Sequence, residues 1–210
     1  MLQPAEPENV DIEGIKRGIH QVSVNPAEGH KAQILASGVA LPWALEAQGL
    51  LLEWGVSADV WSVTSWSELR RDGIRCDEQK FLQPNHDAPM PYITQKLAEA
   101  QGPKLGVSDF DHMVPDMIRP WVPGRYATLG ADGFGFSDTR AAARRFFKID
   151  GPSIAVRILE QLVEKGKIDA SIPQQAIDKS VFGAPTYVVD GDMFWGQDRL
   201  DFVERKLAAR

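Results

Sequence analysis

Short apolar runs alternate with stretches of helical periodicity along most of the chain. Four of the runs are typical of buried strands, at residues 32–36, 58–63, 104–110 and 126–130. Apolar residues at three- and four-residue spacing predict helices at 41–54, 67–71, 92–101, 112–118, 137–147 and 153–165. Residues 12–24 are expected to form a short helix that runs into an edge strand, and the proline-rich stretch 83–91 a surface loop.

This alternation of strands and helices is typical of βαβ units, whose right-handed crossovers produce a mainly parallel sheet. The strands are nearly uninterrupted apolar runs, as expected of strands that helices cover on both faces. We therefore expect an α/β fold, a doubly wound three-layer sandwich. Ligands of such folds bind beyond the carboxyl ends of the strands.

The pattern changes after residue 180. Apolar runs at 187–189 and 193–195 flank Asp190-Gly191, a strong hairpin signal. An amphipathic helix is expected to follow, capped by Gln197 or Asp198. The sequence therefore predicts two parts, an α/β domain over residues 1–180 and a hairpin plus helix over residues 181–210.

The composition is that of an ordinary globular protein and narrows the choice of partners. Hydrophobic residues make up 43% of the 210 residues and charged residues 25%, with a formal net charge of -6. An acidic chain without a dense Lys or Arg run is poorly suited to a phosphate backbone, so we expect no nucleic-acid partner. The acidic start is unlike a signal peptide, and no apolar stretch reaches the length of a membrane helix. We expect a cytoplasmic protein without membrane contact.

Few residues suggest catalysis or metal binding. The four histidines are scattered without a pair at ligand spacing, so we expect no metal site. Cys76 is the single cysteine, which excludes an intramolecular disulfide. Arg75 beside it is expected to lower the pKa of the thiol slightly, but no base is placed to activate it. The charged residues of 68–72 are expected to form a solvated helix face, and the tryptophans to serve packing. No catalytic residue is assigned.

Residues 129–140, LGADGFGFSDTR, follow the last of the four expected strands. Gly130, Gly133 and Gly135 would permit a tight turn with positive φ angles and a close backbone approach. Ser137 and Asp138 are expected to cap the next helix. The glycine spacing does not match the GxGxxG dinucleotide fingerprint, so we expect no NAD site. Taken alone, the motif is more typical of a tight connection than of a ligand site.

Three segments in this order, GIKRGIHQV, SVTSWSELRRDG and LGADGFGFSDTRAAARRFFKID, carry a family resemblance. They resemble the C-terminal domain of the homodimeric decarboxylating component of bacterial pyruvate dehydrogenase complexes, over roughly residues 4–180. The fold that this implies is that of a transketolase C-terminal domain. The family pattern more often has Thr at Ala131 and often Arg at Phe136, and the phenylalanine is associated with actinobacterial members. If an arginine at that position contacts a ligand or a neighbouring domain in other members, Phe136 cannot make that contact here.

The resemblance implies a supporting role for this chain. In the family, thiamine diphosphate and magnesium bind between the N-terminal and middle domains, at a G-D-G motif followed by an Asn pair. The nearest string here is Asp190-Gly191-Asp192, with no Asn pair after it, so no cofactor is expected in this chain. Oxidative decarboxylation of pyruvate with acetyl transfer would then require the missing domains. The implied partners are those domains, a second copy in a homodimer, and other components of the dehydrogenase complex.

Residues 181–210, which contain FGAPT and FWGQDR, resemble a different family. They are similar to the C-terminal end of 2-hydroxychromene-2-carboxylate isomerases and kappa-class glutathione transferases, within the DsbA-like thioredoxin superfamily. That resemblance implies a cis-proline step at Ala184-Pro185, whose preceding backbone pairs with glutathione. It also implies a helix start at Gln197 and Asp198 that receives a glutathione carboxylate. The active-site serine half of that family has no counterpart upstream.

Three interpretations remain open at this stage. The leading one is a structural and dimerising domain of a pyruvate dehydrogenase (acetyl-transferring), inactive without its missing domains. The second is a remnant of a glutathione-dependent 2-hydroxychromene-2-carboxylate isomerase, and the third is a noncatalytic interaction module. A natural gene fusion, a truncated reading frame or a built chimera would each account for the junction near residue 180.

Overall fold

A computed structural model describes residues 10–84, 87–133, 135 and 137–178, together with the backbone of 186–189 and 192–195. The chain divides into two compact units, Met1–Lys167 and Ile168–Arg210. Because the placement of one relative to the other is not determined, each is described by itself.

The first unit contains one five-stranded sheet with the strand order β1-β3-β2-β4-β5. Its strands are β1 (Ile19–Ser23), β2 (His30–Ala36), β3 (Val56–Val63), β4 (Lys104–Val107) and β5 (Tyr126–Leu129). Neighbouring strands are parallel, except that β1 runs antiparallel to β3. The expected edge strand is therefore found at the edge, and the mainly parallel α/β architecture is confirmed.

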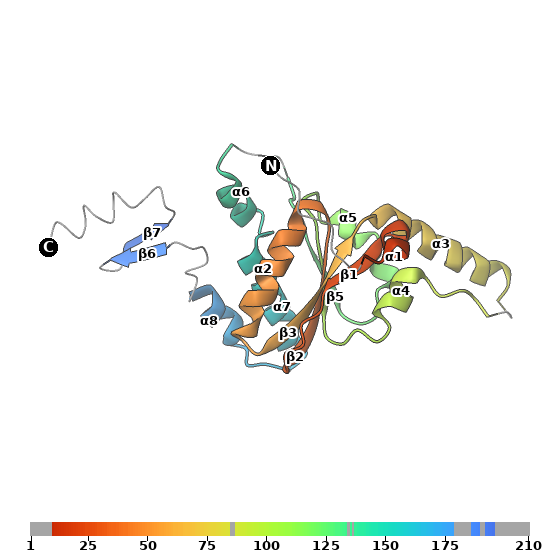
Figure 1. Cartoon of the computed structure of the whole chain (residues 1–210), viewed down its shortest axis with the longest axis horizontal. Coiled ribbons are helices and arrows are strands. Elements are labelled where there is room, and N and C mark those ends of the chain that lie inside the picture. The colour runs from red at the N-terminus through yellow and green to blue at the C-terminus, as the bar shows by residue number, and fades with distance from the viewer. Residues whose placement is uncertain are drawn as a thin grey trace. The chain divides into compact units, whose positions relative to one another are not determined.

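Helices lie on both faces of this sheet (Figure 1). In chain order they are α1 (Ile12–Arg17), η1 (Gly38–Ala40), α2 (Leu41–Leu52), α3 (Trp66–Leu82), α4 (Tyr92–Leu97), α5 (Met113–Asp116), η2 (Arg119–Trp121), α6 (Arg140–Phe146) and α7 (Gly151–Glu164). Helices α2 and α7 pack against each other over one face, with contacts to β3 and β4. On the other face, α3 and α4 cover a core cluster that includes Leu35, Trp61 and Tyr126. The three-layer sandwich follows from this arrangement.

Central strand β2 is buried on both faces. Ile34 and Leu35 are consecutive and therefore point to opposite faces, yet both have no exposed surface. Between β2 and its neighbours, the buried amide of Gln33 accepts a hydrogen bond from Trp61 Nε1 at 2.7 Å. The same amide donates to Asp59 and to the carbonyl of Gln101, each at 3.2 Å. A polar side chain at the centre of the sheet is thus fully paired, as burial requires.

Helix α3 is much longer than its sequence pattern predicts. Ser65 caps its start as expected, accepting a hydrogen bond from the amide of Glu68, but the helix continues to Leu82 instead of ending near Arg71. Its buried positions after Leu69 are an aspartate, a glycine and a cysteine. Because these residues are not typical apolar residues, the helical spacing of buried positions cannot be recognised from the sequence pattern. The prediction of its end was wrong for that reason.

Asp72 on α3 corrects the expectation of a solvated charged face. This carboxylate is buried, pairs with Arg75 and accepts a hydrogen bond from the amide of Tyr92 at 2.6 Å. It therefore holds the first turn of α4 against α3. Helix α4 itself ends at Leu97, short of the expected residue 101, because Gly102 and Pro103 follow it closely.

The second unit includes α8 (Ile172–Asp178), which the sequence pattern did not predict, and the strands β6 (Thr186–Val189) and β7 (Asp192–Trp195). The two strands pair antiparallel, with Val189 opposite Asp192, which confirms the expected strand pair. The expected terminal helix lies outside the described residues. Among the described helices, none is both long and apolar enough to cross a membrane.

Helix α6 ends in a Schellman motif with an unusual residue. Ile149 donates its amide to the carbonyl of Arg144, and Lys148 donates its amide to Arg145, both at 3.1 Å. The position between helix and chain exit is left-handed in this motif and normally glycine. Here it is Lys148, at φ 58°, and it is the one non-glycine residue with positive φ in the described part of the chain.

We expect Lys148→Gly to raise the free energy of unfolding by about 0.5–1 kcal/mol, because glycine adopts the left-handed conformation without the steric cost of a Cβ atom. Chemical denaturation followed by circular dichroism measures the change. Lys148→Ala is the matched control, since it removes the charge and keeps the Cβ atom. An equal gain in the alanine variant would attribute the effect to charge and refute the backbone explanation.

Helix α7 buries a glutamine whose amide is unpaired. Gln161 is 1% exposed, and neither its Oε1 nor its Nε2 atom has a hydrogen-bond partner. We expect Gln161→Met, which has a similar shape, to raise the free energy of unfolding by about 1–3 kcal/mol because the desolvation penalty disappears. Gln161→Glu should lower it. Loss of stability in the methionine variant, measured by thermal unfolding, would mean that the amide has a water partner.

Candidate functional site

A hollow with a volume of about 760 Å³ lies beside the edge strand β5. It extends to the carboxyl ends of β4 and β5, where α/β folds bind ligands. Its lining is mostly polar and comprises His112, Asp116, Arg119, Gly124, Arg125, Tyr126, Ala127, Thr128, Leu129, Gly130, Asp132, Phe147, Lys148 and Arg157. We refer to this hollow as the β5 cleft.

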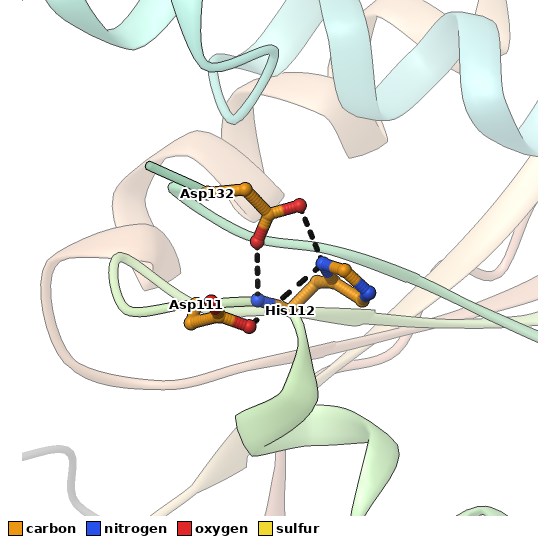
Figure 2. A group of neighbouring side chains, drawn as sticks. All are labelled: Asp111, His112 and Asp132. Atoms are coloured by element: carbon orange, nitrogen blue, oxygen red, sulfur yellow. Dashed lines mark hydrogen bonds and ion pairs between the residues drawn. The ribbon is translucent and has the colours of Figure 1, made fainter. Parts of the chain in front are cut away.

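Three side chains, Asp111, His112 and Asp132, meet where the loops after β4 and β5 come together (Figure 2). Two of them, His112 and Asp132, line the β5 cleft. Asp132 accepts a hydrogen bond from the amide of His112 at 2.9 Å, and its other carboxylate oxygen pairs with His112 Nδ1. Asp111 lies 3.8 Å from the same ring nitrogen and accepts the amide of Met113. The backbone hydrogen bond from His112 is the main cause that holds the pKa of Asp132 below its usual value.

The glycine turn makes this meeting of loops possible. A Cβ atom on Gly130 would lie 2.2 Å from the amide nitrogen of His112, so only glycine allows the two loops to touch. Gly133 has φ 99°, a backbone conformation that favours glycine. Among the three glycines, positive φ is found at Gly133 alone; Gly130 serves the close approach. The turn thus uses both properties that the glycines were expected to permit, a positive φ angle at Gly133 and a close backbone approach at Gly130.

The helix cap after this turn also differs from the expectation. Thr139 caps α6 by accepting the amide of Ala142 on its hydroxyl, at 3.3 Å. Asp138 accepts only the amide of its neighbour Thr139, at 2.6 Å. The cap thus falls one residue later than Ser137 and Asp138, because residues 137 and 138 are still part of the turn.

One nitrogen and two carboxylate oxygens of Asp111, His112 and Asp132 lie within 4.8 Å of one another. This donor set could hold a divalent transition metal. All three side chains are exposed, however, and exposed groups of this kind commonly pair without an ion. No sequence pattern indicates this group, since Asp132 is far from the other two residues along the chain and only the tertiary structure brings it close.

The lower part of the β5 cleft is tied together by structural contacts. Thr128 donates its hydroxyl to Asp116 at 2.9 Å, and Arg119 pairs with the same carboxylate at 2.5 Å. Arg119 also donates to the outward carbonyl of Tyr126 at 2.7 Å. The buried hydroxyl of Tyr126 donates to Pro115 at 2.9 Å, and burial raises the pKa of this phenol. These contacts fix α5 and η2 to β5. The residues that line the β5 cleft include neither a serine nor a cysteine that could act as a nucleophile.

Cys76 is not activated. The thiol is buried on α3, and burial, reinforced by the nearby carboxylate of Asp72, raises its pKa. The expected lowering by Arg75 is present but smaller, because Arg75 is paired with Asp72. The expectation of a slightly lowered pKa was wrong for this reason.

The residues that the tail resemblance nominated for glutathione are Ala184, Pro185, Gln197 and Asp198. All four lie outside the described residues, so their role stays a prediction. Phe136, the departure from the family pattern, lies outside them as well.

The chain is similar to known proteins both in its tail sequence and in its fold. A DSBA-like thioredoxin domain matches residues 158–208, which supports the tail resemblance. A transketolase from Pichia stipitis solved with sedoheptulose 7-phosphate superposes with a TM-score of 0.51 at 19% identity, covering 77% of this chain and 20% of that one. At this low identity, the similarity supports the fold and not a function.

Closer relatives are named pyruvate dehydrogenase E1 component. The protein from Mycobacterium tuberculosis is 53% identical over 90% of this chain and 21% of its own length. Those from Mycolicibacterium smegmatis and Escherichia coli K12 are 52% and 37% identical, each over 84% of this chain and 19% and 20% of their own lengths. The chain thus spans about a fifth of the length of these relatives. The transketolase-like TK C-terminal domain matches residues 18–150, and the chain therefore belongs to that family.

Proposed function

We propose that this chain is the C-terminal structural domain of a pyruvate dehydrogenase E1-type enzyme. In this role it braces a dimer and takes part in oxidative decarboxylation of pyruvate only together with N-terminal and middle domains. The observation that carries the proposal is the 53% identity to an E1 component over 90% of this chain, within 21% of that protein's length. The same proposal implies that the chain has other components of a dehydrogenase complex as partners and that it is located in the cytoplasm.

The described residues do not fit the thiamine diphosphate and magnesium of such an enzyme. The anchor needs carboxylate and amide oxygens on a common motif, and Asn25 is the one asparagine in the described part of the chain. Its side chain accepts the amide of Ala27 at 3.0 Å and its backbone amide is held by Asp59. Asn25 is thus committed to a turn before β2. No chemical step of the cofactor is assigned to this chain.

The proposed domain extends from the chain start to about residue 180, and the remaining residues form a separate C-terminal fragment. The burial of apolar residues on both faces of the sheet supports an independently folding first part. Identity to E1 components over 84–90% of the chain supports an extension beyond residue 150.

Domain replacement tests the proposed function. In the Mycobacterium tuberculosis relative, the C-terminal segment is exchanged for residues 18–180 of this chain. We expect a dimeric enzyme that keeps most of its pyruvate-dependent reduction of an artificial electron acceptor, because the fold and its contacts are preserved. Gly130→Leu in the same hybrid should abolish the dimer or the activity, since the side chain would collide with the backbone of His112.

The isolated 210-residue chain is the control for this experiment. It should show neither pyruvate-dependent reduction nor heat of binding when titrated with thiamine diphosphate and magnesium. Activity or cofactor binding by the chain alone would contradict the supporting role. A hybrid enzyme that assembles yet is inactive would contradict the proposed equivalence of the domains.

A second candidate function rests on the match of residues 158–208 to a DSBA-like thioredoxin domain and on the antiparallel pair β6–β7. We propose it as the alternative, a remnant of a glutathione-dependent isomerase of the 2-hydroxychromene-2-carboxylate type. The proposed contacts are Ala184-Pro185 toward the glutathione backbone and Gln197 and Asp198 toward a glutathione carboxylate.

We expect no stabilisation of the chain by glutathione, because a hairpin and one helix cannot enclose a tripeptide. A thermal shift with millimolar reduced glutathione measures this, with Pro185→Ala as the matched variant. Stabilisation of the native chain that Pro185→Ala removes would establish the alternative function.

A further inference from the structure

The carboxylates of Asp111 and Asp132 differ from the other acidic groups around the β5 cleft in their cationic partners. Each arginine of the cleft lining has a carboxylate of its own, in the pairs Arg119–Asp116, Arg125–Glu164 and Arg157–Glu160. Within the part of the chain that the structure describes, Asp111 and Asp132 form ion pairs with His112 alone, which is cationic only when protonated. Two negative charges thus share one histidine.

The three side chains converge on one point (Figure 2). Atom Nδ1 of His112 faces both carboxylates, because it pairs with Asp132 and lies 3.8 Å from Asp111. This nitrogen and one oxygen of each carboxylate lie within 4.8 Å of one another. Donors on one metal ion lie about 3–3.4 Å apart, since each is 2.0–2.2 Å from the metal. An ion that replaces the proton between Nδ1 and Asp132 would therefore require only small side-chain movements.

Backbone amides orient both carboxylates. Asp132 accepts the amide of His112 at 2.9 Å on the oxygen that does not face Nδ1. Asp111 accepts the amide of Met113 at 2.8 Å. Hydrogen bonds of this kind orient the ligands of metal sites and contribute to their affinity. The donor set is thus arranged by the two loops themselves.

The surroundings of the three side chains leave room for an ion and for water. His112 and Asp132 are part of the wall of the β5 cleft, and all three side chains are exposed. Three protein ligands leave at least one coordination position open to water. The loops after β4 and β5 are joined here by a hydrogen bond from the amide of Ala131 to the carbonyl of Phe110, at 2.8 Å. A bound ion would add a second link between the same two loops.

We propose that Asp111, His112 and Asp132 bind one divalent first-row metal ion, Zn²⁺ or Mn²⁺, through Nδ1 and one oxygen of each carboxylate. A mixed set of imidazole and carboxylate suits these ions, whereas Mg²⁺ and Ca²⁺ prefer oxygen ligands throughout. The two positive charges of the ion balance the two carboxylates, and the ion clamps the loops after β4 and β5 together. The inference is independent of the proposed E1 role and stands or falls without it.

Titration of the full chain with Zn²⁺, followed in ¹H–¹⁵N spectra, tests the proposal. We expect a saturable shift of the Nδ1 resonance of His112, assigned with His112→Gln, because the ion replaces the proton at that nitrogen. The backbone amides of residues 111–113 and 130–132 should respond at the same concentrations. Mg²⁺ should give no saturable shift in that range, since it has little preference for an imidazole nitrogen.

Two variants separate a metal site from an acidic surface. His112→Gln and Asp132→Asn each remove one donor, so affinity, followed on the amides of 130–132, should fall at least about tenfold. His112→Gln keeps the backbone amide that Asp132 accepts, so the contact between the loops is retained.

His30→Gln and Asp138→Asn are the matched controls. Both residues are exposed and lie outside the donor set, so neither change should alter the affinity for Zn²⁺. No saturable shift with Zn²⁺, equal binding of Mg²⁺, or unchanged affinity in His112→Gln would overturn the proposal.

Discussion

Burial of β2 on both faces is the constraint on which the remainder of the first unit depends. A strand without a solvent face must be apolar along its length, must have parallel partners on both sides and must be covered by helices twice. Gln33, a polar residue buried within β2, is tolerated there because Trp61, Asp59 and the carbonyl of Gln101 satisfy its amide. The chain leaves the end of β2 toward α2 and the end of β4 toward α5, so these two connections lie on opposite faces of the sheet.

Fold class was accessible from the sequence because the strands are continuous apolar runs, a signal that survives without tertiary context. The length of α3 was not, since its buried stripe passes through Asp72, Gly73 and Cys76, which only packing against α4 and Trp121 makes suitable for an interior. The β5 cleft was also beyond sequence reasoning. Asp132 reaches His112 through the close approach at Gly130, and the sequence shows the glycine but not what passes beside it.

The glycine motif that carried the family resemblance has an architectural explanation in this structure. Gly130 makes room for the backbone of His112, and Gly133 adopts a positive φ angle of 99°. The motif therefore joins the ends of β4 and β5, and the family resemblance of these residues requires no reaction to take place there. This agrees with the proposed supporting role of a chain that spans about a fifth of the length of its E1 relatives.

Arg119 has a further consequence for the chain in solution. Strand β5 is an outer strand, and its outward carbonyls offer a template for pairing with a strand of another molecule. Arg119 occupies the carbonyl of Tyr126 and is itself held by Asp116, so a charged guanidinium lies across the free edge. An incoming strand would have to break that pair and bury a cation. The domain thus carries its own protection against edge-to-edge aggregation.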